Sequence, residues 1–287
     1  MKNNDKFAVF ILTHGRANNQ TTYKTLLRSG YTGKIYFLVD NEDKQQDDYK
    51  KLYGSSVIIF DKKAIAETTD AGDNFKKLNS VVYARNANVE IAQKLGLDYF
   101  WQLDDDYNIF LWKIDNEKNF ISGIKIKKLD SILKAMVKFL EESDIDCVAM
   151  AQGGDFIGGE GSSIFKNFQK GTFTRKVMNS FLFSTKKPTK FIGRMNDDVN
   201  TYIVYGKQGK VFCTLPRVSL NQAQTQANSG GLTEMYLELG TYVKSFYTVM
   251  MAPSCTKIKE MGTNRRLHHQ IKWNNAVPKI ISEDYKK

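Results

Sequence analysis

The sequence predicts an α/β protein built on a mainly parallel sheet, and three observations indicate this. Short apolar runs alternate with segments of helical period over the first 150 residues. The composition, 41% hydrophobic and 25% charged residues, is typical of a globular chain with a buried core. No low-complexity linker or internal repeat divides the 287 residues. We therefore expect a single domain in which residues 1–150 and 151–287 form two abutting halves.

The first half supplies the strands of the expected sheet and the helices that connect them. Five apolar runs have the length of buried strands: Lys6–Leu12, Lys34–Val39, Val57–Phe60, Tyr99–Leu103 and Cys147–Ala151. Three segments have helical character: Asn18–Arg28, Phe75–Leu95 and Leu129–Leu140. Strands joined through helices pair in parallel, so we expect βαβ units here.

The second half is less regular and has a weaker pattern. Strands are expected at Val177–Ser184 and Lys210–Leu215, and helices at Asn196–Tyr205 and Gly231–Met250. A glycine-rich loop spans Gln152–Ser163. The last 25 or so residues are polar and basic, and we expect them to form a tail that lies over the rest of the protein.

Several protein classes are disfavoured by the composition. No apolar run approaches the roughly 20 residues that cross a bilayer, and the N-terminus lacks the apolar region of a secretion signal. The cysteines, Cys147, Cys213 and Cys255, are odd in number and far apart. This pattern disfavours a disulfide framework and a metal-binding cysteine cluster, and it leads us to expect a cytoplasmic protein without a membrane partner.

The net charge of +11 is unevenly distributed. Residues 1–150 contain 22 basic and 22 acidic residues, whereas residues 151–287 contain 20 basic and 9 acidic residues. Solubility alone would not require this asymmetry. Clustered lysine and arginine side chains favour a polyanionic partner, because binding to phosphates releases counterions. We therefore expect the second half to contact a polyanion.

The strongest chemical signal is the run LDDD at positions 103–106, directly after an apolar strand. Three neighbouring carboxylates at a buried strand end raise one another's pKa, and a divalent cation relieves this repulsion. Parallel sheets bind ligands at the carboxyl ends of their strands. An acidic surface turn is the alternative explanation.

Other polar residues follow neighbouring strands and are expected at the same edge of the sheet. Thr13–Arg16 (THGR) closes the first strand, and Asp40 ends the second. Arg85 and Asn86 lie on the helix before the acidic strand. Each has an ordinary structural explanation by itself, such as helix capping. Together they supply the basic, amide and acidic groups that hold a nucleoside diphosphate through a metal ion.

These segments resemble a known fold. FAVFILTHGR, KIYFLVDNED and ARNANVEIAQKLGLDYFWQLDDDY are similar, in order and spacing, to the nucleotide-sugar half of GT-A glycosyltransferases. The resemblance covers roughly residues 6–215. More narrowly, the THGR, NDDV and GGLTEMY segments resemble the TET/JBP-associated glycosyltransferases, largely phage enzymes that glycosylate hydroxylated pyrimidines in DNA. The resemblance implies a Rossmann-like nucleotide-sugar-binding sheet abutting a smaller mixed acceptor-binding half.

The resemblance also implies roles for single residues. Asp104 corresponds to the residue nearest the ribose and a metal ligand, Asp106 to the main ligand of Mn2+ or Mg2+, and Asp105 to a residue facing the sugar. The residues implied at the donor are Thr13, Arg16, Asp40, Arg85, Asn86, Asp104 and Asp105.

The acidic pair Asp197-Asp198 resembles the place where GT-A enzymes keep their general base, with Asp-Asp replacing the usual Glu-Asp. Asp198 is our first choice as the base and Asp197 the second. Capping of the following helix is the alternative. The adjacent histidines His268 and His269 match, by position only, a further metal ligand supplied by the C-terminal segment, of which at most one would bind. A solvated basic tail that contacts DNA phosphates is the alternative explanation for these histidines.

The acceptor side is expected in the second half. The uncharged polar loop Asn221–Thr233 carries amides and hydroxyls suited to base edges and sugars. Basic and aromatic residues nearby add charge and a stacking surface. The residues expected to contact the acceptor are Gln222, Thr225, Arg265, Arg266, Lys272 and Trp273.

The sequence therefore favours a metal-dependent glycosyltransferase that uses a nucleotide sugar, with a UDP-sugar as first choice. The expected acceptor is double-stranded DNA with hydroxylated pyrimidines, and the expected setting is phage DNA modification in the host cytoplasm. A first alternative keeps the fold but glycosylates a glycan, a lipid-linked sugar or a protein. A second is a non-catalytic DNA-binding protein, which leaves the LDDD run unexplained.

Overall fold

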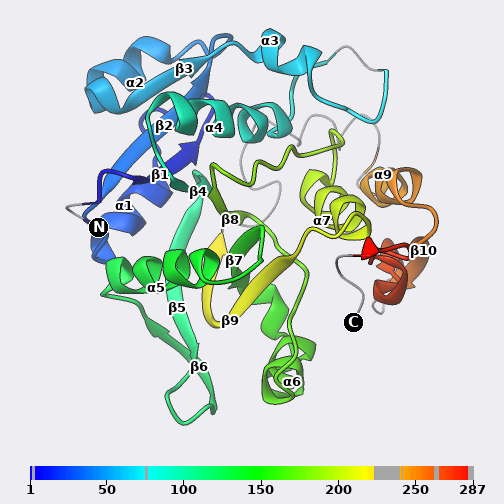
Figure 1. The fold of residues 1–287 in the computed structure, drawn as a ribbon. Helices are drawn as coiled ribbons and strands as arrows, with labels where there is room; N and C mark the ends of the chain where they lie inside the picture. Colours follow the sequence, from blue (N-terminus) through cyan, green and yellow to red (C-terminus); the bar gives the residue numbers. More distant parts are fainter. Residues whose placement is uncertain (2–3, 75–76, 223–239, 241, 262–264, 284–287) are drawn as a thin grey trace.

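A nine-stranded sheet organises the computed structural model, which describes residues 1, 4–74, 77–222, 240, 242–261 and 265–283 (Figure 1). The strand order is β3-β2-β1-β4-β8-β7-β9-β5-β6. The strands are β1 (Phe7–Leu12), β2 (Lys34–Asp40), β3 (Val57–Phe60), β4 (Tyr99–Asp104), β5 (Tyr107–Ile114), β6 (Phe120–Lys125), β7 (Cys147–Gln152), β8 (Ser180–Ser184) and β9 (Phe212–Gln222). Both halves of the chain contribute strands to this one sheet.

The first four strands form the predicted parallel unit. β1 pairs in parallel with β2 and with β4, and β2 pairs in parallel with β3. Leu12 at the end of β1 lies beside Leu38 of β2 and Asp104 of β4. Because these carboxyl ends share one edge, the residues that follow β1, β2 and β4 are brought together there.

The remaining strands differ from the expected mainly parallel sheet. β8 runs antiparallel to both β4 and β7, and β5 runs antiparallel to β9 and β6, whereas β7 and β9 are parallel. β5 and β6 follow the acidic run and were not predicted. Because β5 leaves β4 through a two-residue turn, Asp105 and Asp106 lie at a sharp change of chain direction.

Helices cover both faces of the sheet. They are α1 (Thr21–Arg28), α2 (Gln46–Tyr53), α3 (Lys62–Glu67), α4 (Val82–Lys94), α5 (Leu129–Glu141), α6 (Ser163–Gln169), α7 (Asp197–Lys207) and α9 (Val243–Met251), with short 3-10 turns at Gly54–Ser56, Gly153–Phe156, Gly159–Gly161 and Trp273–Asn275. Alternate residues of β1 face two separate cores: Phe7, Val9 and Ile11 pack with α1, α2 and α5, whereas Ala8, Phe10 and Leu12 pack with α4 and α7.

Two predicted elements have different bounds. α4 begins at Val82 and not at Phe75, because the preceding stretch, as far as it is described, forms a loop tied to other segments. α9 covers only the end of the helix expected at Gly231–Met250, of which residues 231–239 and 241 lie outside the described residues.

The C-terminal segment is a hairpin and not a tail. β10 (Thr256–Met261) and β11 (Arg266–Ile271) pair antiparallel and pack against α9. Figure 1 places this hairpin beside α9 and α7, at the side of the molecule away from β3 and α2. Within the described ranges, none of the helices has the length and apolar character that a membrane span requires.

Candidate active site

The acidic run lies at the carboxyl end of β4, where the sequence predicted it. Asp104 closes the strand with a partly exposed side chain, and its carbonyl oxygen accepts a 2.6 Å hydrogen bond from Thr22 Oγ1. Asp105 is buried, and burial raises the pKa of its carboxyl group. Asp105 accepts hydrogen bonds from Thr13 Oγ1 at 2.7 Å and from the Arg16 guanidinium at 2.6 Å. It therefore faces the loop after β1, and the expectation that it faces the sugar stays a prediction.

Asp106 has the properties of a cation ligand. Burial, followed by the charges of Asp104 and Asp105, raises the pKa of Asp106 to about 7. Its Oδ1 atom is buried and has no hydrogen-bond partner among the described residues. A hard divalent cation would neutralise this repulsion and use the unpartnered oxygen. Asp106 and the neighbouring Asp104 therefore fit the predicted metal site.

The loop after β1 is fixed by a buried hydrogen-bond network. Thr13 Oγ1 contacts Asp105, the Tyr49 hydroxyl at 2.8 Å and Gln20 Nε2 at 2.7 Å. The Tyr49 hydroxyl also accepts from the backbone N–H of Arg16 at 2.9 Å. Thr13 thus holds the loop in place, while Arg16, paired with Asp105, remains 27% exposed at the edge of the sheet.

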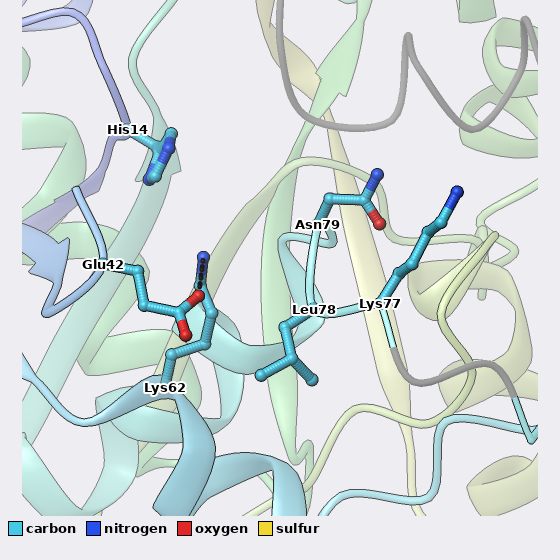
Figure 2. Close-up of a pocket in the computed structure, with 6 residues that line it drawn as sticks. All are labelled: His14, Glu42, Lys62, Lys77, Leu78 and Asn79. Carbon is cyan, nitrogen blue, oxygen red and sulfur yellow. Dashed lines mark ion pairs between the residues drawn. The ribbon is translucent and has the colours of Figure 1, made fainter. Parts of the chain in front are cut away.

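A second charged cluster follows β2. Asp40 is buried and pairs with His14 Nδ1 at 2.6 Å and with the Lys62 ammonium at 2.9 Å. Burial acts to raise the pKa of Asp40, but the hydrogen bonds and charges of these two partners outweigh it and keep this pKa below its usual range. Lys62 also lies 3.8 Å from Glu42 (Figure 2). Asp40 is therefore an ionised carboxylate held between the His14 imidazole and the Lys62 ammonium.

This cluster borders a cavity of about 360 Å³. Figure 2 shows His14, Glu42 and Lys62 on one side and Lys77, Leu78 and Asn79 on the other. The Asn79 Oδ1 atom is buried and has no hydrogen-bond partner among the described residues. Buried polar atoms are normally paired, so this acceptor favours a ligand with a donor group in the cavity.

The His14–Asp40 pair gives a pH-dependent prediction. The Asp40 carboxylate, through its hydrogen bond, raises the pKa of His14 above the usual 6.5. A raised histidine pKa stabilises the fold fully below the unfolded-state pKa, and the contribution is lost as pH rises through the folded value. His14→Gln should therefore lower the free energy of unfolding at about pH 5.5 more than at about pH 8.5. Because His14 is half exposed, the difference should stay below about 1 kcal/mol.

Urea unfolding of both proteins at the two pH values measures this difference. Lys63→Gln, which removes an exposed cation next to Lys62, is the control and should show no such pH dependence. An equal effect of His14→Gln at both pH values would contradict an ionised pair.

Arg85 joins the acidic strand end to α7. The Arg85 side chain is 3% exposed, and its guanidinium lies 2.7 Å from Asp197 and 3.5 Å from Asp104. The rings of Phe181 and Phe191 lie 5.1 and 5.4 Å from it. Arg85 is therefore held inside the protein between two carboxylates, next to the expected donor residue Asp104, and its position by the donor stays a prediction.

Asn86 also differs from its expected place at the donor. Its side-chain amide donates to Thr69 Oγ1 and to the Phe191 carbonyl, each at 3.0 Å, and its oxygen accepts from the Phe191 N–H at 2.7 Å. These bonds tie α4 to the loop before α7. Asn86 is thus engaged in holding the fold.

The acidic pair begins α7, as predicted, but its two members differ. Both are buried, and burial raises the pKa of each carboxyl group, while Arg85 acts in the opposite direction. Asp197 pairs directly with Arg85. Asp198 accepts a hydrogen bond from the Val199 N–H at 2.7 Å and has no ion pair within 4.0 Å among the described residues. A carboxylate with a raised pKa and no such counter-ion suits proton abstraction.

The two predicted histidines lie on the C-terminal hairpin. His268 and His269 are on β11, and the His269 Nδ1 atom lies 3.3 Å from the Asn196 amide nitrogen, which donates to it. Burial lowers the pKa of His269 to about 4. In the described part of the chain, no three His, Cys, Asp or Glu side chains gather to hold a metal. That a histidine joins Asp104 and Asp106 in one metal centre stays a prediction.

The expected acceptor residues are distributed over the second half. Gln222 ends β9 beside Tyr107, one residue after the acidic run. Arg265, Arg266 and Lys272 are exposed at the hairpin. Trp273 stacks on Tyr202 with ring centres 5.7 Å apart, and Arg175 lies over it, so its expected role as an open stacking surface needs correction. Thr225 and most of the loop Asn221–Thr233 lie outside the described residues.

Three residues near the candidate site were not predicted from the sequence to belong to it. Lys62 follows β3, as Asp40 ends β2, so the same strand-end rule could have identified it. Asn79 lies in a segment that was predicted to be helical. Asn196, whose side chain contacts α9 and β11, has a left-handed backbone (φ 52°), which asparagine tolerates better than most residues.

Comparisons with known proteins agree with this arrangement. Residues 7–231 match the family model described as TET-associated glycosyltransferase. No curated protein matches the chain. The predicted α/β fold class of GT-A type is confirmed by the family match and the observed sheet.

Solved structures show a more distant similarity. Glucosyl-3-phosphoglycerate synthase from Mycobacterium tuberculosis, in complex with Mn2+, UDP and phosphoglyceric acid, is 8% identical, with a TM-score of 0.45 over 92% of this chain and 86% of that one. The mannosyltransferase PcManGT from Pyrobaculum calidifontis, in complex with GDP-Man and Mn2+, is 12% identical. The match covers 86% of this chain and 73% of that one, with a TM-score of 0.47. These similarities are too weak to add to the family match.

Proposed function

The chain belongs to the TET-associated glycosyltransferase family, and from this premise we propose that it transfers a sugar from a nucleotide-sugar donor to a hydroxylated pyrimidine in DNA. The observation that carries the proposal is the position of Arg85, within 4 Å of both Asp104 and Asp197. Through this one side chain, the candidate metal-binding strand end is joined to Asp197, the residue directly before the candidate base Asp198. Glycosyl transfer needs this combination, because the leaving diphosphate and the attacking hydroxyl meet at one carbon.

The cavity beside His14 and Asn79 is the proposed binding site for the nucleoside of the donor, with a UDP-sugar as first choice. Its volume of about 360 Å³ lies within the range of small-ligand pockets. Arg16 lies at the same strand edge and would meet the diphosphate.

Asp104 and Asp106 are the proposed ligands of Mn2+ or Mg2+. Bound there, the cation would neutralise charge that develops on the departing diphosphate. Two carboxylates leave coordination positions for phosphate oxygens, which accounts for a site with fewer than three protein ligands among the described residues.

Asp198 is the proposed general base. It removes the proton from the acceptor hydroxyl as the hydroxyl oxygen bonds to the anomeric carbon and the bond from that carbon to the diphosphate breaks. The pKa of Asp198 is raised by burial, which brings its basicity closer to that needed at neutral pH. Asp197 is held by Arg85 and is less available for this step.

The proposed division of labour follows the charge distribution. Residues 1–150, with balanced charge, bind the donor, and residues 151–287, with eleven excess positive charges, bind DNA. The biological setting proposed is modification of bacteriophage DNA in the host cytoplasm.

This division predicts different salt dependences for the two substrates. The logarithm of DNA affinity should fall with the logarithm of salt concentration, with a slope of about −0.9 for each phosphate neutralised. Donor affinity should change much less, because a partly buried site is screened less. The triple substitution Arg265→Ala, Arg266→Ala and Lys272→Ala should flatten the DNA slope by up to about three units and leave donor affinity unchanged.

Titrations of DNA and of donor between low and moderate salt measure both constants. The matched control is the triple alanine variant of Lys125, Lys127 and Lys128, which are exposed lysines of the first half and should leave the DNA slope unaltered. DNA affinity that is insensitive to salt would contradict the proposal and favour a glycan acceptor.

A further inference from the structure

Helix α9 presents an apolar face to solvent. Tyr242, directly before the helix, and Phe246 and Met250 within it follow one another at intervals of four residues, so they share one face. They are 53%, 46% and 53% exposed, and the two aromatic rings contact each other edge to face with centres 6.5 Å apart. Large apolar side chains grouped in this way mark an interaction surface more often than isolated ones do.

The position of α9 is fixed relative to the acidic pair. The Asn196 side chain, directly before Asp197, donates to the Lys244 carbonyl at 2.9 Å and to Thr248 Oγ1 at 3.1 Å. From the same buried side of the helix, the Tyr247 hydroxyl bonds to Asp73, which pairs with Arg194 at 2.9 Å. The buried side of α9 is therefore held against the turn that carries Asp198, and its exposed face points outward from there.

The surroundings of this face are basic. Residues 242–283, which include α9 and the β10–β11 hairpin packed against it, contain seven lysines and arginines and two glutamates. Lys257, Lys259, Arg265 and Arg266 of the hairpin are exposed. Two copies of so basic a segment would repel each other, whereas DNA phosphates are attracted, so charge complementarity favours DNA as the occupant.

Asp198 itself gives a reason for an aromatic surface at this place. Its side chain is buried, at 7% exposure of the residue, so the hydroxyl that it deprotonates must come into the protein. The hydroxymethyl group of a stacked pyrimidine lies in the major groove, where a buried carboxylate does not reach it. Enzymes that act on a base in such a site take the base out of the stack, and inserted apolar side chains fill the space it leaves.

We propose that the face formed by Tyr242 and Phe246 stacks against DNA bases beside the target and holds the target pyrimidine unstacked for Asp198. This proposal rests on the proposed function, because it requires DNA as the acceptor. In this proposal, α9 keeps the target base out of the stack, and the basic β10–β11 hairpin attracts the DNA phosphates.

The test uses the full chain and a hydroxymethylated duplex that carries 2-aminopurine next to the target base, because 2-aminopurine fluorescence rises when stacking is lost. Wild-type protein should raise the fluorescence. The variant Tyr242→Ser/Phe246→Ser should raise it little and should bind the duplex about tenfold more weakly. Donor affinity and transfer to the free hydroxymethylated nucleoside should be unchanged, because neither requires unstacking. Ile124→Ser, at an exposed position on the distant strand β6, is the matched control and should behave as wild type.

The outcomes separate this inference from the proposed function. If wild-type protein modifies and unstacks the duplex, and the double variant does so equally, the inference is wrong and the proposed function stands. If wild-type protein neither binds nor modifies DNA, both are wrong. If the double substitution changes only the sedimentation of the protein, the face contacts a second copy of the chain and the DNA role is overturned.

Discussion

Asp106→Asn should lower sugar transfer by about 10³-fold or more, because a metal ion at the reacting phosphates contributes several kcal/mol to transition-state stabilisation. The same substitution should not weaken the fold. Asp106 has a pKa raised to about 7 by burial and by Asp104 and Asp105, so its ionised form is disfavoured in the folded protein. Removing that charge should keep or increase stability at neutral pH, and the gain should vanish as pH falls below about 4.

Product formation and urea unfolding, measured on the same preparations, test both parts. Asp47→Asn, on the exposed surface of α2, is the matched control and should change neither quantity. In wild-type protein, EDTA should abolish transfer and Mn2+ should restore it. Full activity of Asp106→Asn, or of wild-type protein in EDTA, would contradict the metal site.

Asp198→Asn should lower turnover by about 10²-fold or more while leaving donor affinity little changed, because the base acts on the acceptor hydroxyl. The neighbouring substitution Asp197→Asn should have a different signature. Burial raises the pKa of Asp197 as it does that of Asp106, but Asp197 is the 2.7 Å partner of a buried arginine. Its removal leaves the Arg85 charge with only Asp104 at 3.5 Å, so the main effect should be a loss of stability of about 3 kcal/mol.

Steady-state kinetics and unfolding of the two variants separate these roles. A larger turnover effect of Asp197→Asn in a stable protein would assign the base to Asp197. A loss of donor affinity in Asp198→Asn with unchanged turnover would place Asp198 in the donor site.

The position of the strand-end residues at one edge of the sheet was predictable from the sequence. Thr13, Asp40 and Asp104 each follow or end an apolar run, and parallel strands bring such positions to one edge whatever the rest of the fold does. The acidic pair at the start of α7 was equally visible as charged residues before a helical stretch.

The direction of side chains on helices was not predictable. Arg85 and Asn86 are neighbours on α4, and the sequence does not reveal that one meets Asp197 and the other Phe191, because both partners lie more than a hundred residues away.

The strands of the β10–β11 hairpin were not predictable from the composition of the segment. Lysine and arginine occupy strand positions there, so the segment has the composition of a tail although its backbone pairs over six positions.

The most direct test of the proposed function is mass spectrometry of nucleosides from DNA containing 5-hydroxymethyl pyrimidines, after incubation with the protein, Mn2+ and a panel of nucleotide sugars. One sugar donor should increase the mass of the hydroxymethylated nucleoside by one sugar residue. Unmodified DNA and the Asp106→Asn variant should give no product. A donor that is consumed only in the presence of a glycan, with no change in any nucleoside, would contradict the DNA acceptor.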